Sequence, residues 1–246
     1  MILRRVIKHF RQQEWTAIFL DFLIVVVGVF VGLQVSNWNA TQAARHNYKM
    51  AVERYEAEVR ANLADLRKME NLALTGLKIA QNGLDTLLLC EDSPENRLIV
   101  NNGINAIGGT PGIMMRTTAL FELTQSPAML AQQSNAERQR FSNTRYQIEA
   151  LLSEGRFFER LPLEERLENN PILQLGARKY RNGKSLGHSF SSNTHPLILS
   201  VPLDEACQDN MLVKSFYTWD KWQNLVPELL TNLQNLLENS LEELEP

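Results

Sequence analysis

One acidic residue, Asp21, stands inside the apolar run of residues 15–35, WTAIFLDFLIVVVGVFVGLQV. On an α-helix with about 100° per residue, Asp21 falls within about 40° of a line of small and apolar residues. The other members of this line are Val25, Gly28, Gly32 and Val35. Gly28 and Gly32 form a G-x-x-x-G pattern, which lets two membrane helices approach closely. We therefore predict a helix–helix contact face made of these five residues.

The carboxyl group of Asp21 restricts what this face can contact. Charged groups inside a membrane are costly and normally point at a partner rather than at lipid. Three hypotheses follow: self-association, contact with another subunit of a membrane complex, and a proton-coupled role. The single-pass stator subunits of flagellar and Ton/Tol motors share the layout of a short tail, a span with an early Asp and a periplasmic part. That likeness is one of layout only.

The apolar run is long enough to cross a bilayer. Its 21 residues span about 30 Å as a helix, which matches the hydrocarbon thickness. Trp15 and Trp38 bracket it as interfacial anchors do. The other apolar stretches are much shorter, so a single-pass protein is predicted. A cleaved signal peptide is the alternative, but its apolar segment is typically about 7–15 residues and ends in small residues.

The tail before the run orients it. Arg4, Arg5, Lys8 and Arg11 stand against Glu14 alone. Basic residues beside a span stay in the cytoplasm. We therefore expect a bacterial inner-membrane protein with a cytoplasmic N-terminus and a periplasmic C-terminal domain.

The charge of the remaining chain narrows its partners. Residues 1–14 hold four of the 25 basic and one of the 28 acidic residues, which leaves 21 basic and 27 acidic residues downstream. No basic stripe stands out there, so nucleic acid is not expected as a partner. The expected partners are the lipid bilayer and, through the span, a second copy or another membrane protein. No cofactor is expected.

Two cysteines, Cys90 and Cys207, are the only thiols of the chain. In an oxidising periplasm they can form a disulfide. The alternative is two separate buried thiols, because the sequence does not give their distance. Neither has a His or Cys neighbour at metal-ligand spacing, so no metal site is predicted.

Helical periodicity dominates the external part. From Tyr48 to Leu77 apolar residues recur every three or four positions, and a second stripe extends from Trp222 to Leu244. Ser93-Pro94 and Ser134 or Asn135 read as helix starts. The predicted fold is all-α: an N-terminal transmembrane helix continues into a long helix that packs in an extracytoplasmic helical bundle. The predicted divisions are a basic tail (1–14), a transmembrane helix (15–36), a juxtamembrane helix (37–89) and the rest of the periplasmic domain (90–246).

The segment from Asp21 to Asn39 resembles a family of uncharacterised bacterial single-pass inner-membrane proteins. The hallmark of that family is an acidic residue, Gly seven positions later, and an exit segment of the type L-Q-[IV]-x-N-W-N. Asp21, Gly28, Gln34, Asn37, Trp38 and Asn39 match it. Residues 118–151 are similar, more loosely, to a pair of helices in the same family. The resemblance implies an anchored, largely helical extracytoplasmic protein and brings no known activity.

Catalytic patterns are weak. RNGKS (181–185) lacks the earlier glycine of a phosphate-binding loop, and His188 and His195 have no acid or Cys at ligand spacing. The sequence therefore favours a non-enzymatic anchored scaffold or interaction protein. The alternative is an accessory subunit of a membrane transport or proton-coupled complex that uses Asp21.

Overall fold

The computed structural model describes residues 15–164, 166–185 and 188–244. The protein is mostly helical, with 76% of its residues in helices and 6% in strands. The basic tail predicted for residues 1–14 lies outside the described residues.

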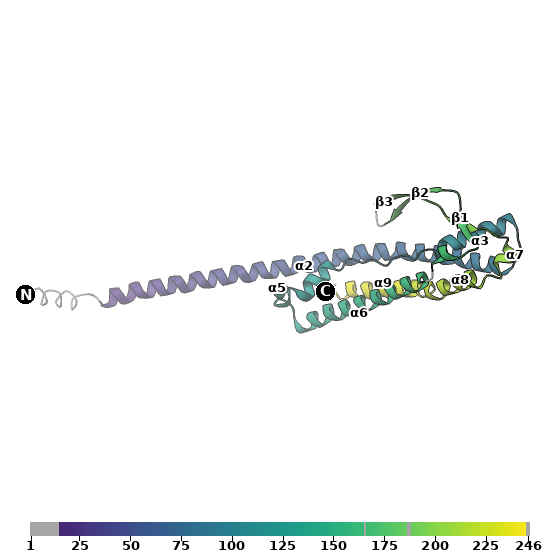
Figure 1. The fold of residues 1–246 in the computed structure, drawn as a ribbon. Helices are drawn as coiled ribbons and strands as arrows, with labels where there is room; N and C mark the ends of the chain where they lie inside the picture. The colour runs from purple at the N-terminus through teal and green to yellow at the C-terminus, as the bar shows by residue number, and fades with distance from the viewer. Residues whose placement is uncertain (1–14, 165, 186–187, 245–246) are drawn as a thin grey trace, which may run out of the picture.

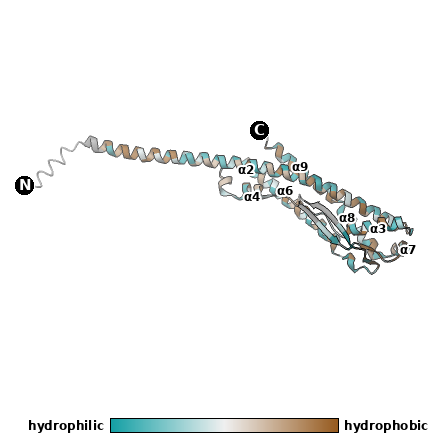
Figure 2. Cartoon of the chain, turned by 90° about the horizontal axis from the view of Figure 1, so that it is seen from above, coloured by the Kyte–Doolittle hydropathy of each residue, from teal (hydrophilic) through white to brown (hydrophobic). Residues whose placement is uncertain are grey.

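Helix α2 (Trp15–Leu88) dominates the molecule (Figure 1). Its 74 residues form one unbroken helix about 110 Å long. No proline interrupts it, and it ends before Cys90, whose φ of 56° reverses the chain. Within the described residues it is the helix long and apolar enough to cross a membrane. Its N-terminal part projects alone, and Figure 2 shows apolar residues concentrated near that end.

The C-terminal half of α2 packs against a first hydrophobic core. The other contributing helices are α4 (Thr118–Gln125), α5 (Pro127–Leu130), α6 (Asn135–Arg160) and α9 (Val226–Glu242). Tyr55 is central: its ring forms a T-shaped pair with the Phe141 ring, with centroids 5.6 Å apart, and its hydroxyl lies 2.6 Å from Ser240 Oγ. The predicted stripe of α2 is confirmed here, because Tyr55, Leu66 and Met69 are all buried.

A second core lies at the end of α2 far from the N-terminus. It includes α3 (Pro94–Ile107), α7 (Leu203–Ala206) and α8 (Asn210–Gln223). The predicted helix start at Ser93-Pro94 is confirmed, since Ser93 caps α3 and Pro94 is its first residue. Gly83 and Gly103 let α2 and α3 cross closely: a Cβ on either glycine would lie 2.8 Å from the other's Cα.

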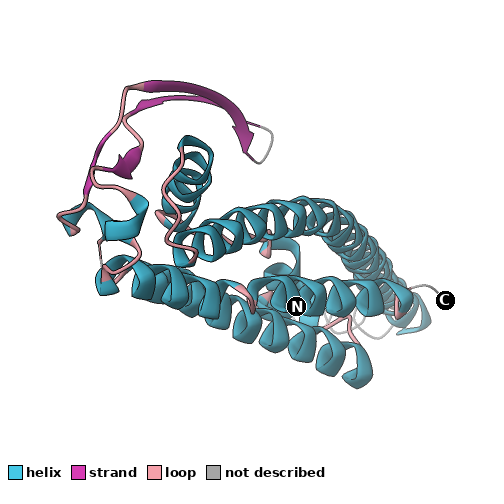
Figure 3. Cartoon of the chain, turned by 90° about the vertical axis from the view of Figure 1, so that its right-hand side faces the viewer, coloured by secondary structure: helices cyan, strands magenta, loops and turns pink. Residues whose placement is uncertain are grey.

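The expectation of an all-α fold is wrong in one region. Two short 3₁₀ turns, η1 (Leu161–Leu163) and η2 (Leu167–Asn169), lead into two antiparallel two-stranded sheets. β1 (Leu173–Leu175) pairs with β4 (Leu197–Leu199), and β2 (Lys179–Ser185) pairs with β3 (His188–Thr194). β1 and β4 are too short to show an alternating pattern, and β2 and β3 consist mostly of polar residues. The β2–β3 hairpin arches away from the packed helices (Figure 3).

The free edge of β4 is held by side chains of α3. The Asn105 amide donates to Leu197 O at 2.8 Å and accepts from Leu197 N at 3.1 Å, and Asn101 Oδ1 accepts from Leu199 N at 2.8 Å. These amides take the place of a neighbouring strand, and unpaired strand edges are otherwise prone to aggregation. The strands are thereby fixed to the helical part.

The start of α6 is tied to α2 by a carboxylate. Ser134 is the N-cap, and Ser134 and Glu137 form the reciprocal capping box, which confirms the predicted start. The Tyr48 hydroxyl also donates to Glu137 Oε1 at 2.8 Å. Burial on its own would raise the pKa of Glu137, but the hydrogen bonds from Ser134 and Tyr48 hold it below the ordinary value of 4.5.

This carboxylate should make the fold acid-sensitive. A carboxyl whose pKa is lowered by folding stabilises the protein above about pH 4.5, and that stabilisation is lost as the pH falls through the folded value. We expect Glu137→Gln to cost about 1 kcal/mol at pH 7 and less at pH 3. Thermal unfolding of both proteins across this range tests it, with exposed Glu53→Gln as the control. An equal loss at both pH values would contradict the assignment.

Candidate interaction sites

The predicted contact face lies on the projecting part of α2. Asp21, Val25, Gly28, Gly32 and Val35 are all exposed, and no described residue covers them. A Cβ added at Gly28 or Gly32 would meet nothing within 4 Å. The flanking Trp38 is 63% exposed, and Trp15 begins the helix, although its side chain lies outside the described part. The structure thus leaves this face open along its whole length.

The direction of this face relative to the packed helices comes from the continuity of α2. The residues that α2 buries, such as Ala51, Tyr55 and Leu66, lie on one side of the helix. At about 100° per residue, the contact face points roughly 160–170° away from that side. A partner helix can therefore approach the face without meeting the packed helices.

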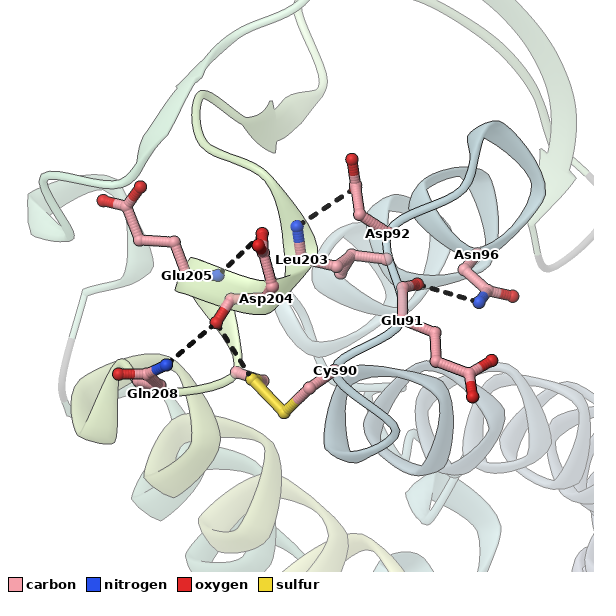
Figure 4. The surroundings of a disulfide bond; sticks show 9 residues. Cys90, Glu91, Asp92, Asn96, Leu203, Asp204, Glu205 and Gln208 are labelled. Carbon is pink, nitrogen blue, oxygen red and sulfur yellow. Dashed lines mark hydrogen bonds between the residues drawn. A yellow bond between two sulfur atoms is a disulfide. The ribbon is translucent and has the colours of Figure 1, made fainter.

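The structure brings the two predicted cysteines together. Cys90 and Cys207 form a disulfide with a Cα–Cα distance of 5.4 Å, which joins the end of α2 to the segment after α7 (Figure 4). Beside it, Asp92 accepts hydrogen bonds from Arg97 Nε at 2.6 Å and from Leu203 N at 3.1 Å. The pKa of the Asp92 carboxyl is lowered most by the hydrogen bond from Arg97 and next by the one from Leu203. The arrangement is a structural clamp, because both thiols of the chain are consumed in the bond.

A groove lies between the hairpin and the helices beneath it. Its volume is about 720 Å³, and it is lined mainly by α2, α3 and the base of the hairpin. Leu72 and Ile79 form an exposed apolar floor, while Lys179 and His195 stand on the hairpin side. His195 Nδ1 donates to Gly176 O at 2.8 Å, which leaves Nε2 of the neutral ring as an acceptor. We call this the hairpin groove.

The sequence did not reveal this groove. RNGKS lies entirely within β2, a strand context that differs from the strand–loop–helix of a phosphate site. His188 begins β3 and His195 follows it. Over the part of the chain that the structure describes, no group of three or more His, Cys, Asp or Glu side chains is placed to hold a metal ion.

A second surface depression runs between α6 and α9. Two adjoining hollows of about 440 and 410 Å³ share Gln147, Leu236 and Asn239 in their walls. Six carboxamide side chains line them: Gln139, Asn143, Gln147, Asn232, Asn235 and Asn239. We call it the amide groove. Sequence reasoning missed it because each amide alone reads as an ordinary solvated residue.

One carboxylate with a raised pKa lies apart from these surfaces. Burial raises the pKa of Glu159, whose Oε1 accepts a hydrogen bond from Ile113 N at 2.6 Å. Thr110 Oγ1 donates to Glu159 O at 3.3 Å. Both bonds fasten the loop after α3 to the end of α6, so this carboxylate has a structural role.

No protein-family model, curated protein or solved structure matches this chain.

Proposed function

We propose that the protein is a single-pass membrane-anchored scaffold whose external helical bundle acts through protein and ligand contacts rather than catalysis. The observation that carries this proposal is the exposed apolar part of α2. From Phe19 to Val35 the large apolar side chains are 44–65% exposed, and no described element covers them. Soluble proteins rarely expose a continuous apolar surface of this size. A bilayer satisfies it without further protein contacts.

Two independent features favour the same orientation. The basic residues of the tail, Arg4, Arg5, Lys8 and Arg11, favour a cytoplasmic N-terminus. At the opposite end of α2, the Cys90–Cys207 disulfide favours an oxidising compartment. We propose a bacterial inner-membrane location with the bundle in the periplasm, in keeping with the family of anchored proteins that residues 21–39 resemble.

The open face of the span supports self-association. Gly28 and Gly32 offer a close backbone approach, and the face points away from the bundle. Two copies can pair through their spans while each bundle stays on the outer side. The second candidate, an accessory role in a proton-coupled or transport complex, is favoured by Asp21 on the same open face.

A topology experiment tests the anchor. Alkaline phosphatase fused after Pro246 should be active, because this enzyme folds only outside the cytoplasm. Green fluorescent protein fused at the same position should be dark, because it does not fluoresce once it has been exported across the inner membrane. Bright fluorescence with inactive phosphatase would overturn the proposed orientation. Release of the untagged protein from membranes by carbonate would overturn the anchor itself.

Pairing through the span has its own test. Gly28→Leu and Gly32→Leu should each lower energy transfer between labelled copies in lipid vesicles at least about fivefold, because the added side chain separates the helices. Val26→Leu, on the opposite side of the helix, is the matched control and should change little. Full energy transfer in both glycine variants would contradict self-association. Loss on Asp21→Asn of a co-purifying multi-span partner would instead favour the accessory-subunit candidate.

A further inference from the structure

The amide groove combines three properties that solvated helix surfaces rarely share. Its six carboxamides come from two adjacent helices and face one depression. None of the six forms a side-chain hydrogen bond with another described residue. Two charged side chains, Arg140 and Glu243, line one end of the groove and neutralise each other: Arg140 Nη1 donates to Glu243 O at 2.7 Å, and Arg140 Nε lies 3.8 Å from Glu243 Oε2. The groove thus offers many donors and acceptors with no net charge.

The carboxamide residues that line the groove lower the helix propensity of α6 and α9. Asn143 lies inside α6, and Asn232, Asn235 and Asn239 lie inside α9. Asparagine ranks well below Ala, Leu, Lys and Glu in helix propensity, and at exposed positions packing does not require it. Departures from local preference of this kind are expected where a surface has a function.

One aromatic side chain at the groove is free to contact a ligand. Tyr146 is 74% exposed and lines the same hollow as Asn232 and Asn235, so its ring is available for stacking. Arg140 adds no free donor at the groove end, because its Nε lies 3.8 Å from Glu243 Oε2 in an ion pair.

The chemistry of the groove selects among ligand classes. Nucleic acid needs phosphate-binding cations, and Ca²⁺ needs carboxylates; the groove offers neither in sufficient number. Protein interfaces are centred on apolar, aromatic and Arg side chains, whereas this groove has two half-buried leucines and one tyrosine. Carboxamides pair each of their donors and acceptors with hydroxyl and acetamido groups.

We propose that the amide groove binds an uncharged carbohydrate chain, with the carboxamides bonding its hydroxyl or acetamido groups and Tyr146 stacking on a sugar face. The amides of α6 from Gln139 to Gln147 cover about 12 Å, which suits a short stretch of polymer. A bundle held outside the membrane would in this way attach to a glycan matrix. This role rests on the proposed external location, but binding by the isolated protein does not depend on it.

The test is titration calorimetry of the full-length protein in lipid nanodiscs, so that no sugar detergent competes. The probes are cellotetraose and the tetramer of N-acetylglucosamine. We expect at least one to bind, and the triple variant Asn232→Ala, Asn235→Ala, Asn239→Ala to weaken it at least about tenfold. Tyr146→Ala should weaken it at least about threefold. The matched controls Asn82→Ala and Tyr217→Ala, exposed on α2 and α8, should leave it unchanged.

Weaker sugar binding by the triple variant would not be due to misfolding, because this variant should be more stable than the wild type. Replacing three exposed helical asparagines with alanine should raise the melting temperature by about 3 °C. No binding of either sugar, or equal weakening in the control variants, would overturn the proposal. A change of oligomeric state in the triple variant without sugar binding would do so too, since the groove would then be an interface between copies. If the protein bound sugar but its alkaline phosphatase fusion were inactive, the proposed location would be wrong while the sugar-binding groove would stand.

Discussion

Replacing Gly103 with alanine should lower the free energy of unfolding by about 2–3 kcal/mol, although alanine is the better helix former by about 1 kcal/mol. The new Cβ would lie 2.8 Å from Gly83 Cα and 2.9 Å from Phe216 Cε1. The first neighbour is backbone of α2 and cannot rotate away. The helices must therefore separate, and the second core around Phe216 loses its close packing.

Gly76→Ala is the matched control: Gly76 lies on α2, the same helix as Gly83, but away from the crossing with α3. A Cβ there meets nothing within 4 Å, so this variant should gain about 0.5–1 kcal/mol from helix propensity. Thermal unfolding by circular dichroism should place the melting temperatures of the two variants on opposite sides of the wild type. A Gly103→Ala protein as stable as Gly76→Ala would show that α2 and α3 do not cross at these glycines.

Breaking the Cys90–Cys207 disulfide should cost about 3–5 kcal/mol. The two cysteines are 117 residues apart, and closing so long a loop removes much entropy from the unfolded chain. The loop contains α3, α4, α5, α6, the strands and α7. Urea unfolding with and without reductant measures the effect, and the double variant Cys90→Ala, Cys207→Ala should match the reduced wild type.

The double variant also supplies the control. Reductant should leave its unfolding curve unchanged, because the chain has no other cysteines. If reductant changed neither the unfolding curve nor the gel mobility of the wild-type protein, that result would contradict the disulfide. It would also remove one of the two supports for the external location.

Local signals in the sequence predicted much of the helical part. The apolar stripe of α2 reappears as buried residues, and the caps at Ser93 and Ser134 lie where their sequences indicate. The C-terminal stripe, predicted from Trp222 to Leu244, lies on two helices, because α8 ends at Gln223 and α9 begins at Val226. Periodicity persists across this break because both helices face the same packed interior.

What the sequence could not predict depends on pairs of distant residues. Gly83 and Gly103 are unremarkable separately, and only the crossing of α2 and α3 gives them meaning. The strands were missed because three-residue segments such as Leu197–Leu199 carry no readable alternation, and because Asn105 of α3 supplies their edge. The amide groove likewise needs α6 and α9 in register. The residues around Asp21 could be placed on one face from the sequence because they lie on one helix, and a contact through this face stays a prediction.

The unbroken α2 has a mechanical consequence. A helix without a hinge transmits torsion, so a turn of its projecting part about the axis turns the packed helices by the same angle. Each residue between Trp38 and Ala51 also adds about 1.5 Å along the helix axis and about 100° of rotation about it. The length of α2 therefore fixes both the distance and the rotation angle between its projecting part and its packed part. A partner that turns the projecting part about the helix axis would also turn the end that carries the Cys90–Cys207 disulfide.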